Sequence, residues 1–305
     1  MDALKDSARA LGVELDDAQV RAFRVYADEL LAWNAKFNLT AITDRAEIDR
    51  KHFLDSLSAL SVIRSLKHDT HAAGESPDAS PSKSHNSQFS TTPSNLDTAD
   101  EFVRARWSLD HAPARSRATA RVAPTNVPAG SNLRVLDVGA GAGFPAVPLK
   151  LACPDWRVTL LEATRKKCDF LEPLVIVLAL RDTRVVWGRA ETAGRTPPVS
   201  SRPAEREQYD LVVARAVAEL NVLAEFMLPF ARVGGHCIAW KGAVEAEVRA
   251  AGRAIEKLGG RISAVCAVQV PGIDAQRNLV VIEKVSSTPA QYPRREGVPS
   301  KKPLQ

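Results

Sequence analysis

Short apolar segments alternate with helical segments from Leu133 to Lys284, and this alternation constrains the fold more than any other feature of the chain. The candidate strands are residues 133–138, 158–162, 183–187, 209–214, 235–240, 264–270 and 279–284. Helical patterns follow most of them, for instance over residues 217–232 and 243–258. Short strands alternating with helices are typical of a mostly parallel sheet that helices cover on both faces. We therefore predict an α/β fold with a seven-stranded sheet.

The first candidate strand runs into three alternating glycines, Gly139, Gly141 and Gly143. Glycine lets the backbone come close to a ligand and adopt dihedral angles that other residues resist. Ligands of a doubly wound sheet bind at the carboxyl ends of its strands, where this loop lies. Glu162 ends the next strand, at a position where an acid commonly accepts hydrogen bonds from ribose hydroxyls. This combination predicts a nucleoside-binding site.

The glycine loop by itself leaves two cofactors open. Gly141, Gly143 and Ala146 meet a looser GxGxxA pattern, so an NAD-linked oxidoreductase is one alternative. Asp137 stands just before the glycines, where a carboxylate can reach the cationic methionine end of S-adenosylmethionine. The loop also lacks the glycine spacing at the start of the helix that a pyrophosphate requires. These two details favour S-adenosylmethionine.

Residues 1–66 have a helical pattern. Apolar side chains recur at helical spacing after Asp16 and Asp17, either of which can cap the helix. A second helix is predicted to begin at Asp44, where Glu47 completes a capping-box pattern. We expect these helices to pack on the catalytic domain.

Composition separates the rest of the chain into three parts. Residues 67–131 are rich in Ser, Thr, Pro, His, Asn and Asp, and we predict a disordered insertion because so little apolar area cannot offset the entropy of ordering it. Residues 132–285 form the predicted cofactor-binding domain. Residues 286–305 form a basic tail.

The net charge of +5 and the isoelectric point of about 9.1 suit an anionic partner. Most of the excess lies near the end of the chain, where a single acid, Glu296, faces five cations: Lys284, Arg294, Arg295, Lys301 and Lys302. A nucleic-acid contact and an ordinary solvated end are both open readings of this tail.

Cysteine usage and hydropathy predict a reduced protein without a membrane span. The four cysteines form no CxxC pair or metal-ligand pattern, so we expect packed thiols and no metal. They are Cys153, Cys168, Cys237 and Cys266. No apolar run reaches the ~18 to 20 residues that cross a bilayer, and the start lacks the apolar core of a signal peptide. We expect a cytoplasmic protein.

A series of motifs, in order, resembles one family. The motifs are NAKFNLTAI (34–42), RKHFLDSL (50–57), DVGAGAGFPAVPLK (137–150), EATRKKCDFLEPL (162–174), GRAE (188–191), VVARAVAEL (212–220), WKG (240–242), RNLVVIEK (277–284) and YPRREGVPSKKPL (292–304). Together they resemble the RsmG family, also called glucose-inhibited division protein B, over the whole chain except residues 67–131. Such an ordered series is far more specific than any one motif.

The resemblance implies a fold, an activity and a partner. The fold is that of a class I methyltransferase, a Rossmann-like sheet with an antiparallel last strand and an N-terminal helical extension. The activity is S-adenosylmethionine-dependent methylation of a guanine N7 in small-subunit (16S) ribosomal RNA. The partner is that RNA or the assembling small subunit, and we expect the enzyme to be a monomer.

The resemblance also assigns residues. It places Gly139 and Phe144 in the cofactor loop, Ala190 and Glu191 beside the adenine, and Arg215 near the methionine end. Polar or basic positions expected to face the cofactor cleft and the RNA are Asn38, His52, Lys166, Arg189, Lys241 and Arg277. We assign Lys167, beside Lys166, to RNA contact as well. Among all of these, Arg215, Lys166 and Arg189 are the candidate catalytic residues. Glu162 stands where many relatives have Asp and Ala146 where they often have Gly, which puts only fine geometry in doubt.

The remaining residues agree with N7 chemistry. N7 carries a lone pair and no proton, so holding it in line with the methyl group is the main requirement, and such positioning can supply ~7 to 11 kcal/mol in ideal cases. The Asn/Asp-Pro-Pro-aromatic clamp of amino-group methylation is replaced by Ala214-Arg215-Ala216-Val217. We expect Cys237 to lie in the core, which argues against carbon-5 methylation. We further expect Arg215 to find its carboxylate on the cofactor.

Three alternatives stay open at this point. The chain could methylate another RNA position or a small molecule. It could be the nucleotide-binding oxidoreductase that the loop permits. It could also be a non-catalytic RNA-binding module with a vestigial cofactor site.

Overall fold

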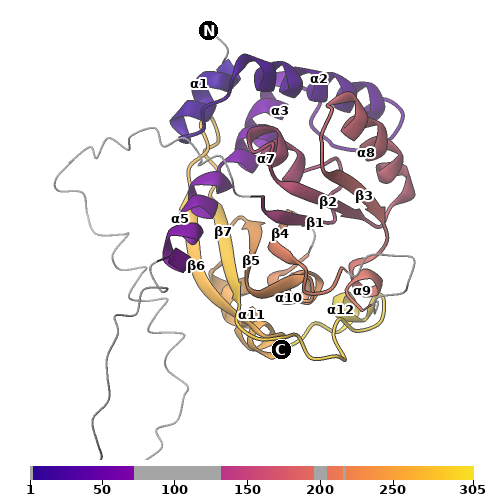
Figure 1. Cartoon of the computed structure of the whole chain (residues 1–305), viewed down its shortest axis with the longest axis vertical. Coiled ribbons are helices and arrows are strands. Elements are labelled where there is room, and N and C mark those ends of the chain that lie inside the picture. Colours follow the sequence, from indigo (N-terminus) through magenta and orange to yellow (C-terminus); the bar gives the residue numbers. More distant parts are fainter. Residues whose placement is uncertain (1–2, 72–131, 196–204, 216–217) are drawn as a thin grey trace, which may run out of the picture. The chain divides into compact units, whose positions relative to one another are not determined.

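All seven predicted strands are present in the computed structural model, and they form one sheet in the order β3-β2-β1-β4-β5-β7-β6 (Figure 1). Their bounds are β1 Arg134–Val138, β2 Arg157–Glu162, β3 Thr183–Trp187, β4 Tyr209–Arg215, β5 Ala231–Lys241, β6 Gly260–Val268 and β7 Arg277–Lys284. Neighbours among β1 to β5 pair in parallel, whereas β7 runs antiparallel to both β5 and β6. The predicted fold class is confirmed.

The structure describes residues 3–71, 132–195, 205–215 and 218–305. Apart from the end of one helix, these residues belong to a single compact unit formed by Met1–His68 and Asn126–Gln305. The predicted insertion, residues 67–131, lies outside the described residues except for 67–71, where a helix continues. In the described part, no helix is long and apolar enough to cross a membrane.

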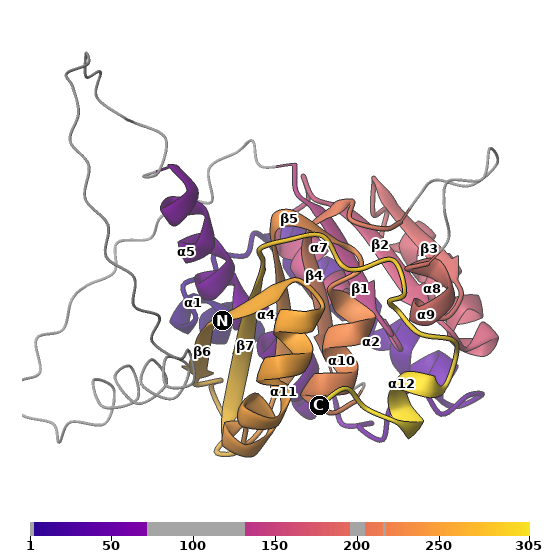
Figure 2. The ribbon, with the colours of Figure 1, turned by 90° about the horizontal axis from the view of Figure 1, so that it is seen from below.

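Helices cover both faces of the sheet (Figures 1 and 2). Their bounds are α1 Ala3–Ala10, α2 Asp17–Asn34, α3 Arg45–Ile48, the π-helix η1 Asp49–Leu54, α4 Asp55–Leu57, α5 Ala59–His71, α7 Ala146–Ala152, α8 Arg165–Val177, α9 Ala190–Ala193, α10 Leu220–Met227, α11 Glu245–Lys257 and α12 Val298–Lys301. The N-terminal helices share one face with α7 and α8, and α10 and α11 cover the other. Because strand side chains alternate between faces, Val213 packs in the core under the N-terminal helices, α7 and α8, whereas Val212 packs in the core under α10 and α11.

The N-terminal helices begin where their caps predict. Asp16 accepts a hydrogen bond from Gln19 N, and the Gln19 side chain accepts one from Asp16 N, so α2 has a complete capping box. Asp44 likewise caps α3 by accepting from Glu47 N at 2.9 Å. The Glu47 carboxylate pairs instead with Arg50, so the predicted second capping box is only half formed.

Two predicted features differ from the structure. The helix predicted over residues 217–232 ends at Met227, because Pro229 has no N–H group to continue the helical hydrogen bonds and β5 begins at Ala231. Some of the cations that we assigned to the basic tail also bind acidic side chains of the domain. Buried Lys284 contacts Glu207, and Arg294 pairs with the fully buried Glu225. The C-terminal segment is therefore docked on the domain, and fewer cations than expected are free to meet a partner.

Candidate active site

The three glycines of the loop after β1 all have positive φ, of 73° at Gly139, 60° at Gly141 and 95° at Gly143. A Cβ built on Gly141 would meet only the Gly139 carbonyl oxygen, at 3.7 Å, so space is open there. A Cβ on Gly143 would lie 2.5 Å from Tyr26 Oη. Gly143 is thus required by the packing of α2 against the loop, a role that the sequence did not indicate.

Tyr26 secures this packing, and sequence reasoning missed it. Its hydroxyl donates to Ala142 O at 2.5 Å, and its ring stacks on Phe144 with centroids 5.3 Å apart. Tyr26 is buried within α2 at helical spacing from the apolar residues of that helix. The sequence signal for Tyr26 was therefore the same as for a core residue.

Glu162, the last residue of β2, holds the glycine loop. Its carboxylate accepts hydrogen bonds from Gly141 N at 2.9 Å and from Thr164 N at 2.7 Å. A carboxylate has about four lone-pair positions. The predicted bond to a ribose hydroxyl therefore stays compatible with these two contacts.

Asp137 is fully buried at the carboxyl end of β1. Its Oδ2 accepts a hydrogen bond from Ala146 N at 3.0 Å, whereas Oδ1 has no partner among the described residues. Burial raises the pKa of Asp137 to about 7, despite the Ala146 N–H and Arg215, which lower it. A buried acceptor without a partner is costly, and a cationic ligand would relieve that cost. The Ala146 N–H, committed to Asp137, is not available to a pyrophosphate at the start of α7.

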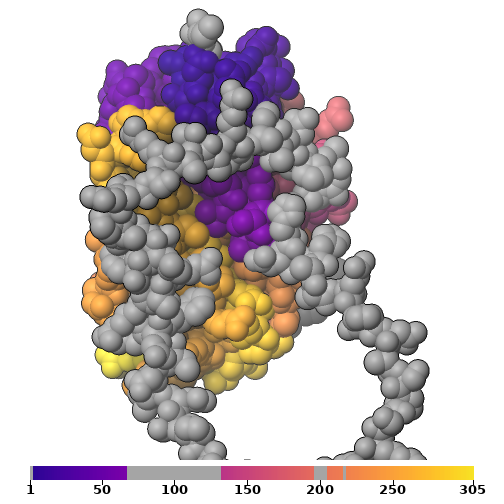
Figure 3. Space-filling model, turned by 90° about the vertical axis from the view of Figure 1, so that its left-hand side faces the viewer, coloured from indigo at the N-terminus to yellow at the C-terminus, as the bar shows by residue number. Residues whose placement is uncertain are grey.

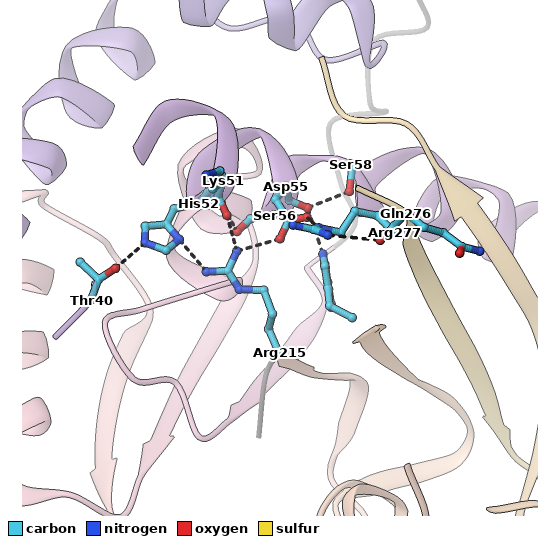
Figure 4. Close-up of polar contacts among 10 residues, drawn as sticks. Thr40, Lys51, His52, Asp55, Ser56, Ser58, Arg215, Gln276 and Arg277 are labelled. Atoms are coloured by element: carbon cyan, nitrogen blue, oxygen red, sulfur yellow. Dashed lines mark hydrogen bonds and ion pairs between the residues drawn. The ribbon is translucent and has the colours of Figure 1, made fainter. Parts of the chain in front are cut away.

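Arg215 ends β4 and reaches the N-terminal helices (Figure 4). Its Nη1 donates to Asp55 Oδ2 at 2.9 Å and to Lys51 O at 3.2 Å. Its guanidinium also lies 5.0 Å from the centroid of the Phe144 ring. The structure corrects the reason that we gave for Arg215: the carboxylate that it meets belongs to the chain itself, because η1 and α4 pack over the end of β4.

His52 lies in η1 and is buried, with its ring stacked on Phe144 at a centroid distance of 4.4 Å. Burial, followed by the charge of Arg215, lowers the pKa of His52 to about 4, so the ring is neutral at pH 7. Arg215 Nη2 lies 3.0 Å from Nδ1 and can only donate, so Nδ1 accepts. Nε2 then carries the proton and donates to Thr40 Oγ1 at 2.8 Å. Both ring nitrogens are occupied, and His52 is thus placed to orient its neighbours.

Arg277 begins β7 and donates from Nε to Asp55 Oδ1 at 3.1 Å. Trp240 in β5 donates from Nε1 to the Asp55 main-chain oxygen at 2.9 Å. Asp55, at the start of α4, thereby joins the N-terminal helices to the ends of three strands. Sequence reasoning missed Asp55, although it lies in the RKHFLDSL motif, where an acid at helical spacing close to Leu54 and Leu57 was a usable signal.

The chain matches the family described as GidB, rRNA small subunit methyltransferase G, over residues 19–72 and 121–280. This chain belongs to the GidB family. Three curated relatives are each named ribosomal RNA small subunit methyltransferase G. The one from Roseiflexus castenholzii is 40% identical over 100% of both chains. The one from Chloroflexus aggregans is 38% identical over 99% of this chain and 97% of the relative, and the one from Symbiobacterium thermophilum is 39% identical over 99% and 96%.

Three of the basic residues that the GidB resemblance assigned to RNA have internal partners. Lys241 is mostly buried, donates to Ala218 O at 2.5 Å and pairs with Glu247 at 2.7 Å. Arg277 is held by Asp55, as described above. Arg189 remains exposed but lies 3.4 Å from Glu296 of the C-terminal segment. Of these three, Arg189 is the most accessible.

The other residues assigned to RNA, apart from the buried His52, lie nearer the surface. Lys166 is exposed at the start of α8, with its ammonium group 5.7 Å from the Phe37 ring centroid. Lys167 is half-buried and Asn38 is exposed. The segment before Thr40 and the start of α8 thus approach each other through the contact of Lys166 with Phe37.

Helix α9 carries Ala190 and Glu191, the predicted neighbours of the adenine. Glu191 is buried and accepts a hydrogen bond from Gly297 N at 3.0 Å. Its neighbour Thr192 donates to Glu296. The C-terminal segment therefore backs this helix, a support that sequence reasoning did not anticipate.

A hollow of about 460 Å³ lies at the opposite edge of the sheet from the glycine loop. Residues at the amino ends of β1, β2 and β4, namely Arg134, Arg157 and Tyr209, line it. Because ligands of such sheets bind at the carboxyl ends of the strands, we do not assign this hollow to the active site.

Proposed function

We propose that this chain transfers the methyl group of S-adenosylmethionine to N7 of a guanosine in 16S ribosomal RNA. Membership of the GidB family makes it an S-adenosylmethionine-dependent rRNA methyltransferase. The NAD-linked oxidoreductase is thereby set aside. The choice of N7, the residue roles and the partner beyond rRNA are our proposals.

The observation that carries the proposal is the buried carboxylate of Asp137 under the glycine loop, whose Oδ1 has no partner among the described residues. The cofactor supplies an electrophilic methyl on a cationic sulfur, and its methionine end adds an ammonium group. Either cation would favour the ionised form of Asp137. Glu162 would accept from the ribose, and Ala190 and Glu191 would line the adenine side. Arg215 would lie near the methionine end.

The side chains that Arg215 contacts suit N7 chemistry, because the acceptor atoms of His52 and Asp55 are already engaged in hydrogen bonds. His52 is neutral with both nitrogens engaged, and N7 requires no base. Burial raises the pKa of Cys237 to about 12, so it provides no thiolate for attack on a pyrimidine ring. The chain's remaining task is to hold the guanine in line with the methyl group.

Exposed cations would hold the RNA through its phosphates. Lys166, Lys167 and Arg189 are the candidates, because each side chain keeps access to solvent. Phosphate contacts position an RNA without reading its sequence. We propose that the substrate is small-subunit rRNA or the assembling subunit, and that a monomer in the cytoplasm carries out the reaction.

Methyl transfer from radiolabelled cofactor to 16S rRNA and to isolated small subunits, followed by mapping of the modified nucleotide, tests the proposal. We expect N7-methylguanosine at one position. Lys166→Ala should weaken RNA binding severalfold and leave cofactor binding unchanged, whereas Lys257→Ala, an exposed lysine at the end of α11, should change neither. Label at a different atom, or on no ribosomal substrate, would refute the N7 assignment.

A further inference from the structure

Asp55 occupies an unusual position for an acidic side chain. It begins α4 directly after the π-helix η1, and its side chain is only 6% exposed. Its main-chain oxygen is bound as well, by Trp240 Nε1 and Ser58 Oγ. Figure 3 shows violet atoms of α5, the helix that follows α4, at the surface below the indigo N-terminal residues. The carboxylate therefore cannot move away from its place without disturbing the helix.

Each oxygen of Asp55 binds a different arginine (Figure 4). Oδ2 accepts from Arg215 Nη1 at 2.9 Å, and Oδ1 accepts from Arg277 Nε at 3.1 Å. Charge-assisted bonds of a planar guanidinium are strongly directional. One carboxylate thus sets the orientation of two cations, at the carboxyl end of β4 and at the start of β7.

The cluster has an excess of one positive charge. The two arginines contribute two positive charges and Asp55 one negative, while His52 is neutral. The nearby Lys51 contributes its carbonyl oxygen to Arg215, and its ammonium group pairs with Glu47. An anion such as a phosphate or a carboxylate would therefore be attracted to the cluster even though Asp55 is present.

Arg215 keeps unused donors. Arginine has five N–H groups. Described residues take three of them, through Asp55, Lys51 and His52. The two remaining N–H groups, one on Nε and one on Nη2, have no bond to the described part of the chain. They belong to a guanidinium that contacts Phe144 in the cofactor loop.

We propose that Asp55 is a positioning residue of the methyl-transfer reaction, which holds Arg215 and Arg277 in the orientation in which they meet cofactor and RNA. The inference rests on the proposed function, because it assumes that these arginines act on those ligands. A purely structural ion pair would instead affect only how well the N-terminal helices stay docked.

The test is Asp55→Asn in the full chain. The amide keeps the size of the side chain and one acceptor but presents an N–H₂ group to one of the two arginines. We expect kcat per folded molecule to fall about tenfold to a hundredfold, because small misplacements of a reacting geometry cost that much. The Kd for S-adenosylmethionine should rise severalfold. The Kd for RNA should change less than about twofold, because the gain in local positive charge offsets the looser orientation of the two arginines.

Glu47→Gln is the matched control. Glu47 is an acid of the same helical region, and its partners are Arg50 and Lys51. It should keep the wild-type kcat and both Kd values. If Asp55→Asn does not fold, Asp55→Asn/Arg277→Gln restores the net charge of the cluster and still deprives Arg215 of its carboxylate, so the same fall in kcat is expected.

A folded Asp55 variant with wild-type kcat and wild-type cofactor Kd would overturn the proposal, and so would a change confined to thermal stability. Cofactor binding is measured by calorimetry without RNA, so the Asp55 test can be read even if the wild-type enzyme methylates another atom. The failure of the N7 assignment and the failure of the Asp55 assignment are thereby distinguished.

Discussion

If Asp137 meets the cofactor as we propose, cofactor binding should depend on pH in a direction that the surroundings of Asp137 determine. Its pKa is raised to about 7 because it is fully buried at the end of β1. In the cofactor-free enzyme the side chain is therefore mostly protonated at pH 6. A cationic cofactor near Asp137 would favour the ionised form, so binding at pH 6 would release the proton.

The size of the effect follows from the fraction of ionised Asp137. With a pKa of about 7, roughly one molecule in ten is ionised at pH 6 and nine in ten at pH 8, so the cofactor Kd should fall about tenfold over that range. Without cofactor, the free energy of unfolding changes with pH in the opposite direction: it falls as pH rises. The protonated form stabilises the fold fully below about pH 4, and up to about 4 kcal/mol of the free energy of unfolding is lost as pH rises through 7.

Calorimetry in buffers of different ionisation enthalpy measures both the Kd and the proton release. The amino group of the cofactor titrates nearby, at a pKa of about 8, so the decisive quantity is the difference between wild type and Asp137→Asn. We expect wild type to release close to one proton at pH 6, and the variant to bind more weakly at pH 8 with no release from this site.

Asp210→Asn serves as the control. Asp210 lies at the amino end of β4 and bonds to Arg232 and to Arg134 N, away from the glycine loop. It should keep the wild-type dependence on pH. If Asp137→Asn retains the same proton release and the same ratio of Kd values as wild type, the assignment of Asp137 to the cofactor is refuted.

Three further outcomes follow from the packing. The pKa of His52 is lowered to about 4, so the neutral ring stabilises the fold fully above pH 6.5, and this contribution is lost as pH falls towards 4. Between pH 7 and pH 5, the free energy of unfolding of His52→Gln should therefore fall by about 2 kcal/mol less than that of wild type, as measured by urea titration. Gly143→Ala should lower the free energy of unfolding by about 1 to 3 kcal/mol, because φ at this position is 95° and the new Cβ would lie 2.5 Å from Tyr26 Oη. Gly141→Ala, where space is open, should lower it by less in the same titrations. Glu225→Gln should release the C-terminal segment, which limited proteolysis would detect as faster cleavage after residue 286; unchanged cleavage would contradict the anchor.

Local sequence patterns were sufficient for the strands and for the starts of two helices. The apolar runs predicted all seven strands, and Asp16 and Asp44 marked the starts of two helices. These features depend on side-chain periodicity and on contacts within about four residues, so a single sequence contains them. The helix after β4 was predicted too long because its apolar pattern continues past the point where Pro229 ends it.

The glycine loop, Asp137 and Glu162 were also recognisable from sequence, because a strand, a turn and an acid at the end of the next strand form a local pattern. Their partners were not. Which N–H group meets Glu162, and which oxygen of Asp137 stays without a partner, depends on how the loop closes against α7 and β2.

The sequence alone determined the sheet, the cofactor loop and the family motifs, whereas tertiary packing decided what each charged residue does. Arg215 and Arg277 lie 160 and 222 residues from Asp55 in the chain, yet both bind its carboxylate. No spacing rule links such positions. A buried cation takes the nearest acceptor that desolvation leaves available, and that acceptor is known only once the N-terminal helices have docked on the end of the sheet.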